Sequence, residues 1–256
     1  MAAQTLQDKI TLIQAAHTQE EAFLQFNILM LDYGYDSNVY TLLTDHPSIG
    51  LKSTHGLVAS YPQSWIDFYN SRRYQQTDPV WRRLLQSPVP FFWGDVVDGL
   101  RYRTDLSAEA VKASLQVMNE ATEAGVTDGI GISYVGPLGE MTAVAVSRTR
   151  GERDRRYDDM AEIYLLATFF HEKFMSFYAR PNPQLTAREA EVLLWAAGNK
   201  SDSEIADIMG VSASTIRFHW KNIFQKLEVT GRLPAVIKAM QMQLITPQFL
   251  AAPKRR

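Results

Sequence analysis

Residues 185–227 have the sequence LTAREAEVLLWAAGNKSDSEIADIMGVSASTIRFHWKNIFQKL, and this stretch decides the fold of the C-terminal part of the chain. Thr186 and Glu189 have the spacing of a capping box, in which each side chain hydrogen-bonds the backbone N–H of the other residue. The same spacing recurs at Ser201 and Glu204. Two capped helix starts within one short stretch predict a compact helical unit.

Gly198-Asn199 and Gly210 mark the ends of these two helices, because glycine and asparagine tolerate the left-handed conformation of a helix C-cap. Ser212 then caps a third helix. Its apolar positions recur at helical spacing and face a core: Ile216, Trp220, Ile223 and Leu227. Its outer positions are Arg217, Phe218, Lys221 and Gln225. A short helix, a turn around glycine and a second helix with a basic outer face fit the major groove of DNA.

This stretch closely resembles the DNA-binding domain of LuxR-type transcription regulators. The matched positions are Thr186, Arg188, Glu189, Glu191, Val192, Leu193, Trp195, Glu204, Ile205, Ala206, Val211, Ser212, Thr215, Ile216, His219, Asn222, Ile223, Lys226 and Leu227. The resemblance implies an all-α domain of four helices over residues 185–256. The family usually has glycine where this chain has Asn199, so we expect the end of the first helix to shift by one residue. A helical bundle with a solvated basic face is the plainer alternative.

Helical spacing also indicates which residues contact DNA. Arg217 and Lys221 lie one turn apart on the outer face, and we expect both to contact base edges, since arginine binds guanine through two hydrogen bonds. Phe218 is expected to touch a thymine methyl group. The positions suited to phosphate contacts, which orient a protein on DNA, are Ser214, Thr215 and Arg232.

Charge is divided unevenly along the 256 residues. From Gln184 onward, ten Lys and Arg stand against six Asp and Glu, a net charge of +4, so residues 1–183 carry −6 of the total of −2. A basic module beside an acidic one fits a DNA-binding domain joined to a domain with a different partner. Because +4 is modest, we expect a homodimer, which doubles the phosphate contacts.

The sequence lacks the residues that several classes of function require. The chain has no cysteines, which excludes disulfides, thiolate catalysis and cysteine zinc sites. No two of the five histidines stand at metal-ligand spacing on one helix, and no nucleophile elbow or phosphate loop supports an enzyme. We therefore expect neither metal nor cofactor. No apolar run approaches the roughly 18 residues of a membrane span, and the N-terminus lacks the pattern of a signal peptide, so we expect a cytoplasmic protein.

Residues 1–179 alternate helical and strand-like segments. Helices are expected over residues 8–30 (split near residue 18), 62–71, 107–123 and 158–179, and from residue 79 onward. Strands are expected over residues 37–43, 57–60, 129–134 and 141–147, the last two forming a hairpin. This order favours an α/β/α sandwich around a mainly antiparallel sheet. The whole chain is thus predicted to be α+β, with the proline-rich residues 180–184 as linker.

The predicted helix over residues 158–179 is expected to expose aromatic side chains among charged ones: Tyr164, Phe169, Phe174 and Phe177. Packing on its own sheet and a dimer contact are both open interpretations.

Aromatic residues are dense between Tyr61 and Trp93, with nine in 33 positions. Core packing is the default for any one of them. Trp and Tyr, however, carry polar tips that need partners when buried, and one acid, Asp78, lies among them. Such a mixture is typical of a closed pocket for an amphipathic small molecule.

A second resemblance covers this region. The pattern Tyr61-Pro62-x-x-Trp65-x-x-x-Tyr69, followed by Asp78-Pro79, Trp93 and Gly125-x-x-x-Gly129, is similar to the ligand-binding domain of the same LuxR-type regulators. It implies that residues 1–179 bind an N-acyl-homoserine lactone and dimerise.

The resemblance also implies roles for these residues. Trp65 would donate its indole N–H to the lactone carbonyl, Asp78 would accept the amide N–H, and Tyr69 would donate its hydroxyl to the acyl carbonyl. The residues expected to surround the head group are Tyr61, Phe91, Trp93 and Gly129, the glycine through close backbone approach. Alternatively, Asp78 serves only as the N-cap of a helix.

Two positions depart from the family pattern. Ser133 stands where many members have proline, and Ala145 stands where serine or threonine often contacts the acyl carbonyl. Ser147, two residues further on the same side of the strand, is expected as the replacement hydroxyl. Any preference for a substituted acyl chain therefore stays open.

The resemblance implies a quorum-sensing transcription factor in which the lactone completes the core, stabilises the fold and the dimer, and controls promoter binding. A ligand at a hundred times its dissociation constant adds about 2.7 kcal/mol to the stability of the folded state. Two alternatives stay open: a DNA-binding regulator that senses another small molecule or none, and, more remotely, a lactone-processing enzyme fused to a DNA-binding domain.

Overall fold

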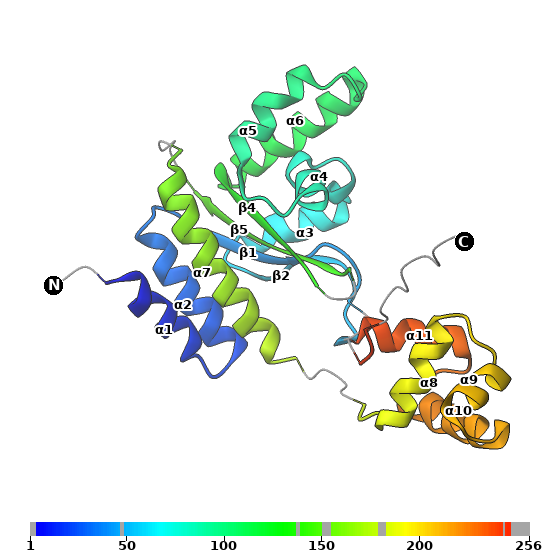
Figure 1. Cartoon of the computed structure of the whole chain (residues 1–256). Coiled ribbons are helices and arrows are strands. Elements are labelled where there is room, and N and C mark those ends of the chain that lie inside the picture. The colour runs from blue at the N-terminus through cyan, green and yellow to red at the C-terminus, as the bar shows by residue number, and fades with distance from the viewer. Residues whose placement is uncertain are drawn as a thin grey trace, which may run out of the picture. The chain divides into compact units, whose positions relative to one another are not determined.

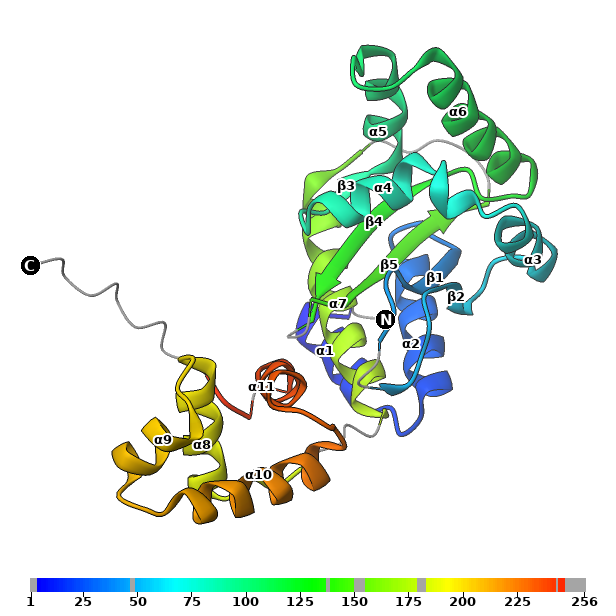
Figure 2. The ribbon, with the colours of Figure 1, turned by 90° about the vertical axis from the view of Figure 1, so that its right-hand side faces the viewer.

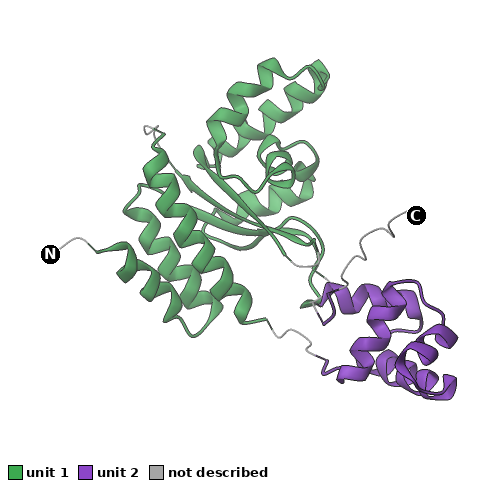
Figure 3. Ribbon diagram, viewed as in Figure 1, with its two compact units in different colours: residues 1–179 green, residues 180–256 purple. Residues whose placement is uncertain are grey.

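The computed structural model describes residues 4–46, 49–136, 139–149, 155–178, 183–242 and 244–246. The chain divides into two compact units, Met1–Ala179 and Arg180–Arg256 (Figure 3). The predicted linker, residues 180–184, falls largely outside the described residues. Among the described residues, none of the helices combines the length and apolarity that a bilayer crossing requires.

A five-stranded antiparallel sheet forms the centre of the first unit (Figure 1). In spatial order its strands are β2 (Thr54–Ala59), β1 (Ser37–Leu42), β5 (Met141–Arg148), β4 (Asp128–Val135) and β3 (Phe91–Phe92). The predicted hairpin is found in β4 and β5, which pair Gly129 with Ser147 and Gly131 with Ala145. Strand β3 was not predicted from the sequence.

Helices cover both faces of this sheet (Figures 1 and 2). One face carries α1 (Leu6–Gln14), α2 (Gln19–Leu31) and α7 (Tyr157–Ser176). The other carries α3 (Gln63–Ser71), α4 (Pro79–Gln86), α5 (Trp93–Gly99) and α6 (Ala108–Glu123). Strand β1 shows how the two cores arise: Tyr40 and Leu42 enter the first core and Val39 enters the second, since alternate strand residues face opposite sides. The predicted α/β/α sandwich is confirmed.

The cap at Thr18 acts as expected, whereas the end of α7 and the burial of Phe174 differ from expectation. Thr18 accepts a hydrogen bond from the backbone N–H of Glu21 and starts α2, which splits the predicted first helix. Helix α7 ends at Ser176, before the predicted residue 179. Phe174, expected to be exposed, is 2% exposed and belongs to the core, whereas Tyr164 remains 40% exposed. That helix therefore packs chiefly on its own sheet.

The second unit contains α8 (Ala187–Ala197), α9 (Asp202–Met209), α10 (Ala213–Leu227) and α11 (Arg232–Gln241). Both predicted capping boxes form, and Ser212 caps α10. The expected one-residue shift at the end of the first of these helices is not found. Asn199 itself adopts the left-handed conformation, with φ of +61°, while Gly198 has an ordinary φ of −78°.

Packing separates the two faces of α10. Ile216, Trp220, Ile223 and Leu227 are all buried in the core of the second unit. Trp220 also donates its indole N–H to Asp202 at 2.9 Å, which ties α10 to the start of α9. The outer face of α10 is thereby held toward solvent.

Candidate functional site

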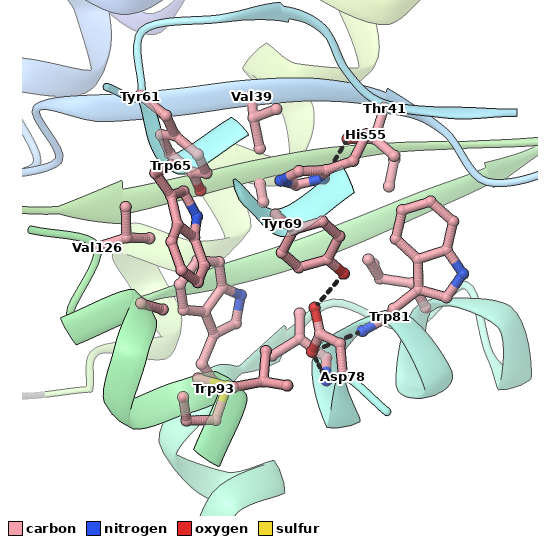
Figure 4. Close-up of a pocket in the computed structure, with 17 residues that line it drawn as sticks. Val39, Thr41, His55, Tyr61, Trp65, Tyr69, Asp78, Trp81, Trp93 and Val126 are labelled. Carbon is pink, nitrogen blue, oxygen red and sulfur yellow. Dashed lines mark hydrogen bonds between the residues drawn. The ribbon is translucent and has the colours of Figure 1, made fainter. Parts of the chain in front are cut away.

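The first unit contains a cavity between the sheet and helices α3 to α6 (Figure 4). Its empty space, including the open side, is about 540 Å³. Most of the wall is apolar, and the side chains that bring polar atoms to it are Thr41, His55, Tyr61, Trp65, Tyr69, Asp78, Trp81 and Trp93.

The two carboxylate oxygens of Asp78 accept hydrogen bonds from different partners. Oδ1 accepts hydrogen bonds from the backbone N–H groups of Val80 at 2.7 Å and Trp81 at 3.3 Å, and so caps α4. Oδ2 accepts the hydroxyl of Tyr69 at 2.7 Å. Burial raises the pKa of Asp78, and the hydrogen bonds it accepts oppose that rise. Because a carboxylate oxygen has two lone pairs, Oδ2 keeps capacity for one more donor.

Trp93 brings a donor without a partner into the cavity. Its side chain is 6% exposed, and the buried Nε1 has no hydrogen-bond partner among the described residues. Figure 4 shows the indole nitrogens of Trp65 and Trp93 turned toward the interior of the cavity. An unpaired buried N–H costs about 1–3 kcal/mol, so this donor indicates a ligand that supplies an acceptor.

Gly129 does not line the cavity but makes room for Trp93. A Cβ at this position would lie 3.0 Å from Cε2 of Trp93 and 2.4 Å from the carbonyl oxygen of Val146. The close approach that Gly129 permits is therefore that of the indole, not that of the backbone to a head group.

Ser147 and Phe91 also lie away from the cavity wall. Ser147 is fully buried; its Oγ donates to the carbonyl of Ser37 at 2.9 Å and lies 3.2 Å from the hydroxyl of Tyr61. The ring of Phe91 covers Gly131, where a Cβ would meet it at 2.5 Å. The structure thus gives Ser147 the role of holding Tyr61, and gives Phe91 a place in the core.

The two departures from the family pattern have different surroundings. Ala145 lines the cavity and brings no hydroxyl to it. Ser133 donates to the carbonyl of Ser87 at 3.2 Å and joins β4 to the end of α4.

His55 was missed by the sequence analysis. It lies on β2, lines the cavity and stacks on Tyr69 with ring centroids 4.2 Å apart. Its side chain is half-buried. Burial lowers the pKa of His55 to about 4, so the ring is neutral at neutral pH. Its place depends on strand pairing, which no local sequence signal revealed.

The outer face of α10 presents the residues predicted for base contact. Arg217 and Lys221 are exposed, and Phe218 is 60% exposed. The hydroxyls of Ser214 and Thr215 lie 2.7 and 2.8 Å from the hydroxyl of Ser212 at the start of α10. A basic helix face with hydroxyls at its N-terminus is suited to DNA.

Arg232 lies apart from that face and is already engaged. It donates to the carbonyl of Lys200 at 2.6 Å, pairs with Asp202 at 3.2 Å, and lies 5.1 Å above the ring of Trp220. These contacts give Arg232 a structural role in joining α11 to α9 and α10. Within the described residues, no cluster of three or more His, Asp or Glu side chains could hold a metal ion.

Comparison with known proteins identifies both units. The family model "Autoinducer binding domain" matches residues 18–174, and "Bacterial regulatory proteins, luxR family" matches residues 183–239. The chain is 30% identical over 194 residues to the HTH-type quorum sensing-dependent transcriptional regulator RpaR of Rhodopseudomonas palustris, covering 74% of each chain. It is 29% identical over 209 residues to the putative HTH-type transcriptional regulator y4qH of Sinorhizobium fredii, covering 80% of this chain but 61% of y4qH.

Solved structures share the fold. The crystal structure of Escherichia coli SdiA matches with a TM-score of 0.73 and 20% identity, over 94% of this chain and 98% of SdiA. SdiA in complex with octanoyl-rac-glycerol matches with a TM-score of 0.73 and 19% identity, over 94% of this chain and 97% of that one.

Proposed function

Because the chain belongs to the LuxR family of bacterial regulatory proteins, with an autoinducer-binding domain and a helix-turn-helix domain, we propose that it is a quorum-sensing transcription factor whose first unit binds an N-acyl-homoserine lactone. The observation that carries the proposal is the pair of polar groups in the cavity: the unpartnered N–H of Trp93 and the remaining acceptor capacity of Asp78. An acyl lactone offers the complement, carbonyl acceptors and one amide donor.

The head group would be held by three side chains. Oδ2 of Asp78 would accept the amide N–H, and the indole N–H groups of Trp65 and Trp93 would donate to the lactone carbonyl. The division of the Asp78 carboxylate supports this arrangement, because capping of α4 occupies only Oδ1.

Tyr61, not Tyr69, is the better donor to the acyl carbonyl. The hydroxyl hydrogen of Tyr69 is already given to Asp78. The hydroxyl of Tyr61 lies 3.2 Å from Oγ of Ser147, a neutral partner whose own hydrogen goes to the carbonyl of Ser37, so the Tyr61 hydrogen can turn to a ligand carbonyl. Burial raises the pKa of both tyrosines, which keeps both protonated. We therefore assign Tyr61 to the acyl carbonyl and give Tyr69 the task of orienting Asp78.

Binding would act on DNA through stability and assembly. A lactone that fills the cavity adds apolar contacts and pairs buried polar groups, and so favours the folded first unit. For the homodimer, α11 offers an apolar stripe: Leu233, Ile237 and Met240, at one-turn spacing, are 69%, 45% and 37% exposed. A second copy of the same stripe would cover it. Two α10 helices would then be presented together to promoter DNA, with Arg217 and Lys221 at base edges and Ser214 and Thr215 at phosphates.

Thermal unfolding of the full chain tests the proposal. The chain is titrated with N-acyl-homoserine lactones of increasing chain length and, separately, with octanoyl-rac-glycerol, the compound named in one SdiA structure. We expect at least one lactone to raise the melting temperature. A rise with the glycerol ester alone, or with neither compound, would favour the regulator that senses another molecule or none. Mass spectrometry of the recovered lactone tests the remote enzymatic alternative, which requires turnover.

A further inference from the structure

Three polar side chains of the cavity wall have no part in the head-group arrangement: Thr41, His55 and Trp81. His55 is held against Tyr69 and lies 6.2 Å, centroid to centroid, from Trp81. A polar ring placed among apolar walls costs free energy unless its donors and acceptors are used. The cavity wall therefore contains a polar ring that requires hydrogen-bond partners.

Thr41 is the hydrogen-bond partner of Nδ1 of His55. Oγ1 of Thr41 accepts the backbone N–H of Gly56 at 3.3 Å and lies 3.2 Å from Nδ1 of His55. The hydroxyl of Thr41 can also donate its hydrogen to Nδ1, and in that tautomer the neutral ring carries its hydrogen on Nε2. No hydrogen bond joins Nε2 to any of the described residues.

His55 lies away from Asp78 and Trp93, and its ring centroid is 6.2 Å from that of Tyr61. In Figure 4, His55 and Thr41 are on the side of the cavity formed by β1 and β2, opposite Asp78 and Trp93. The neighbouring wall is apolar and includes Val39 and Ala143. An acyl chain whose amide is held at Asp78 would extend along such a wall.

We propose that His55 is a specificity-determining residue for the acyl chain, and that the preferred signal is an N-acyl-homoserine lactone with an oxo or hydroxyl oxygen on that chain. This inference rests on the proposed function of the cavity. The Nε2–H of His55 donates to the chain oxygen, while the hydroxyl of Thr41 donates to Nδ1. This contact recognises the oxygen on the acyl chain. Ala145 cannot do so, because it lacks a hydroxyl.

An unsubstituted chain leaves the Nε2–H buried without an acceptor. A hydrogen bond gained or lost in such a place changes affinity about three- to tenfold. The preference for the oxygenated lactone should therefore be of that size and should depend on the donor.

The experiment measures dissociation constants by isothermal titration calorimetry for three lactones of equal chain length, unsubstituted, β-oxo and β-hydroxy. They are compared on the wild-type chain, His55→Phe, His55→Gln and Thr41→Val, with the exposed His17→Phe as control. Wild type and His17→Phe should bind an oxygenated lactone about three- to tenfold more tightly than the unsubstituted one. His55→Phe should lose that preference while it still binds the unsubstituted lactone. His55→Gln, which keeps an N–H donor, should retain part of it, and Thr41→Val should reduce it.

Different failures have different meanings. Equal affinity of the wild type for all three lactones, or an unchanged preference in His55→Phe, overturns the inference and leaves the proposed function standing. If His55→Phe does not fold, a preference that is fully unchanged in both His55→Gln and Thr41→Val overturns it instead. If no lactone binds the wild type, both the inference and the proposed function fail.

Discussion

The hydroxyl of Tyr69 donates to Oδ2 of Asp78 at 2.7 Å, while Oδ1 of the same carboxylate caps α4. One side chain thus serves the fold with one oxygen and faces the cavity with the other. The division makes the two roles separable by substitution.

Asp78→Asn should keep the cap and lose the acceptor. Asparagine caps helices about as well as aspartate, so the free energy of unfolding should change by less than about 0.5 kcal/mol. The amide cannot accept the ligand N–H at the former Oδ2 position, and affinity for the lactone should fall about tenfold or more. Urea unfolding and calorimetry measure the two effects. Asp78→Ala is the matched variant, and it should lose binding and a further ~0.5–2 kcal/mol of stability. If Asp78→Asn binds the lactone with wild-type affinity, Asp78 does not contact the ligand.

Gly129→Ala should destabilise the first unit. The added Cβ meets a backbone carbonyl at 2.4 Å and the ring of Trp93 at 3.0 Å, and the backbone cannot move away without breaking the β4–β5 pairing. We expect a loss of about 1–3 kcal/mol in urea unfolding. Gly99→Ala is the control, because nothing lies within 4 Å of a Cβ at that position. Equal stability of the two variants would contradict the close packing described for Trp93.

His55 should make stability depend on pH. The pKa of His55 in the folded state is about 4, below the ordinary 6.5. The contribution of the neutral ring to the free energy of unfolding is therefore fully present above pH 6.5 and is lost as pH falls toward 4. Between pH 6.5 and 5 the loss should reach about 2 kcal/mol. Asp78 acts in the opposite direction, because burial raises its pKa and protonation stabilises the fold at lower pH.

The measurement is urea unfolding of the wild type and His55→Phe at pH 7 and pH 5. In His55→Phe, the difference in the free energy of unfolding between pH 7 and pH 5 should largely disappear. In His17→Phe, that difference should remain. A pH dependence that is identical in wild type and His55→Phe would show that another group titrates in this range.

Arg217→Ala should change sequence discrimination without changing stability, because Arg217 is exposed on α10. Fluorescence anisotropy with a selected operator and its single-base variants should show a loss of about 1–3 kcal/mol of discrimination at one base pair. Arg188→Ala, on the exposed surface of α8, is the control and should keep it. A uniform loss on all sequences would make Arg217 a phosphate contact.

Leu233→Glu should weaken the homodimer, because it places a charge in the apolar stripe of α11. Sedimentation velocity with saturating lactone should show a shift toward monomer. Ile208→Glu, at an equally apolar and 45% exposed position on α9, should leave the dimer intact. Loss of the dimer in both variants, or in neither, would exclude α11 as the specific contact.

The sequence predicts best what local chemistry determines. Thr186 with Glu189 and Ser201 with Glu204 form the expected caps, because each pair needs only its own helix turn. Asn199 shows the limit of such reasoning, since asparagine takes the left-handed position itself and no shift occurs.

Features that depend on distant partners were missed. Strand β3 has two residues and exists through its pairing with β4. His55 reaches the cavity through the pairing of β1 and β2, which contains an irregularity between Tyr40 and Leu42. Strand alternation placed Ser147 on the expected side of β5, but Tyr61 and Ser37 occupy its hydroxyl. Such side-chain partners follow from tertiary packing and leave no local signal.

A crystal structure of the full chain with its lactone tests the central claim most directly. The account predicts the ligand in the cavity of Figure 4, with its amide nitrogen about 2.7–3.2 Å from Oδ2 of Asp78 and its ring carbonyl facing the indole N–H of Trp65 or Trp93. A lactone bound elsewhere, or one whose amide faces away from Asp78, would contradict it.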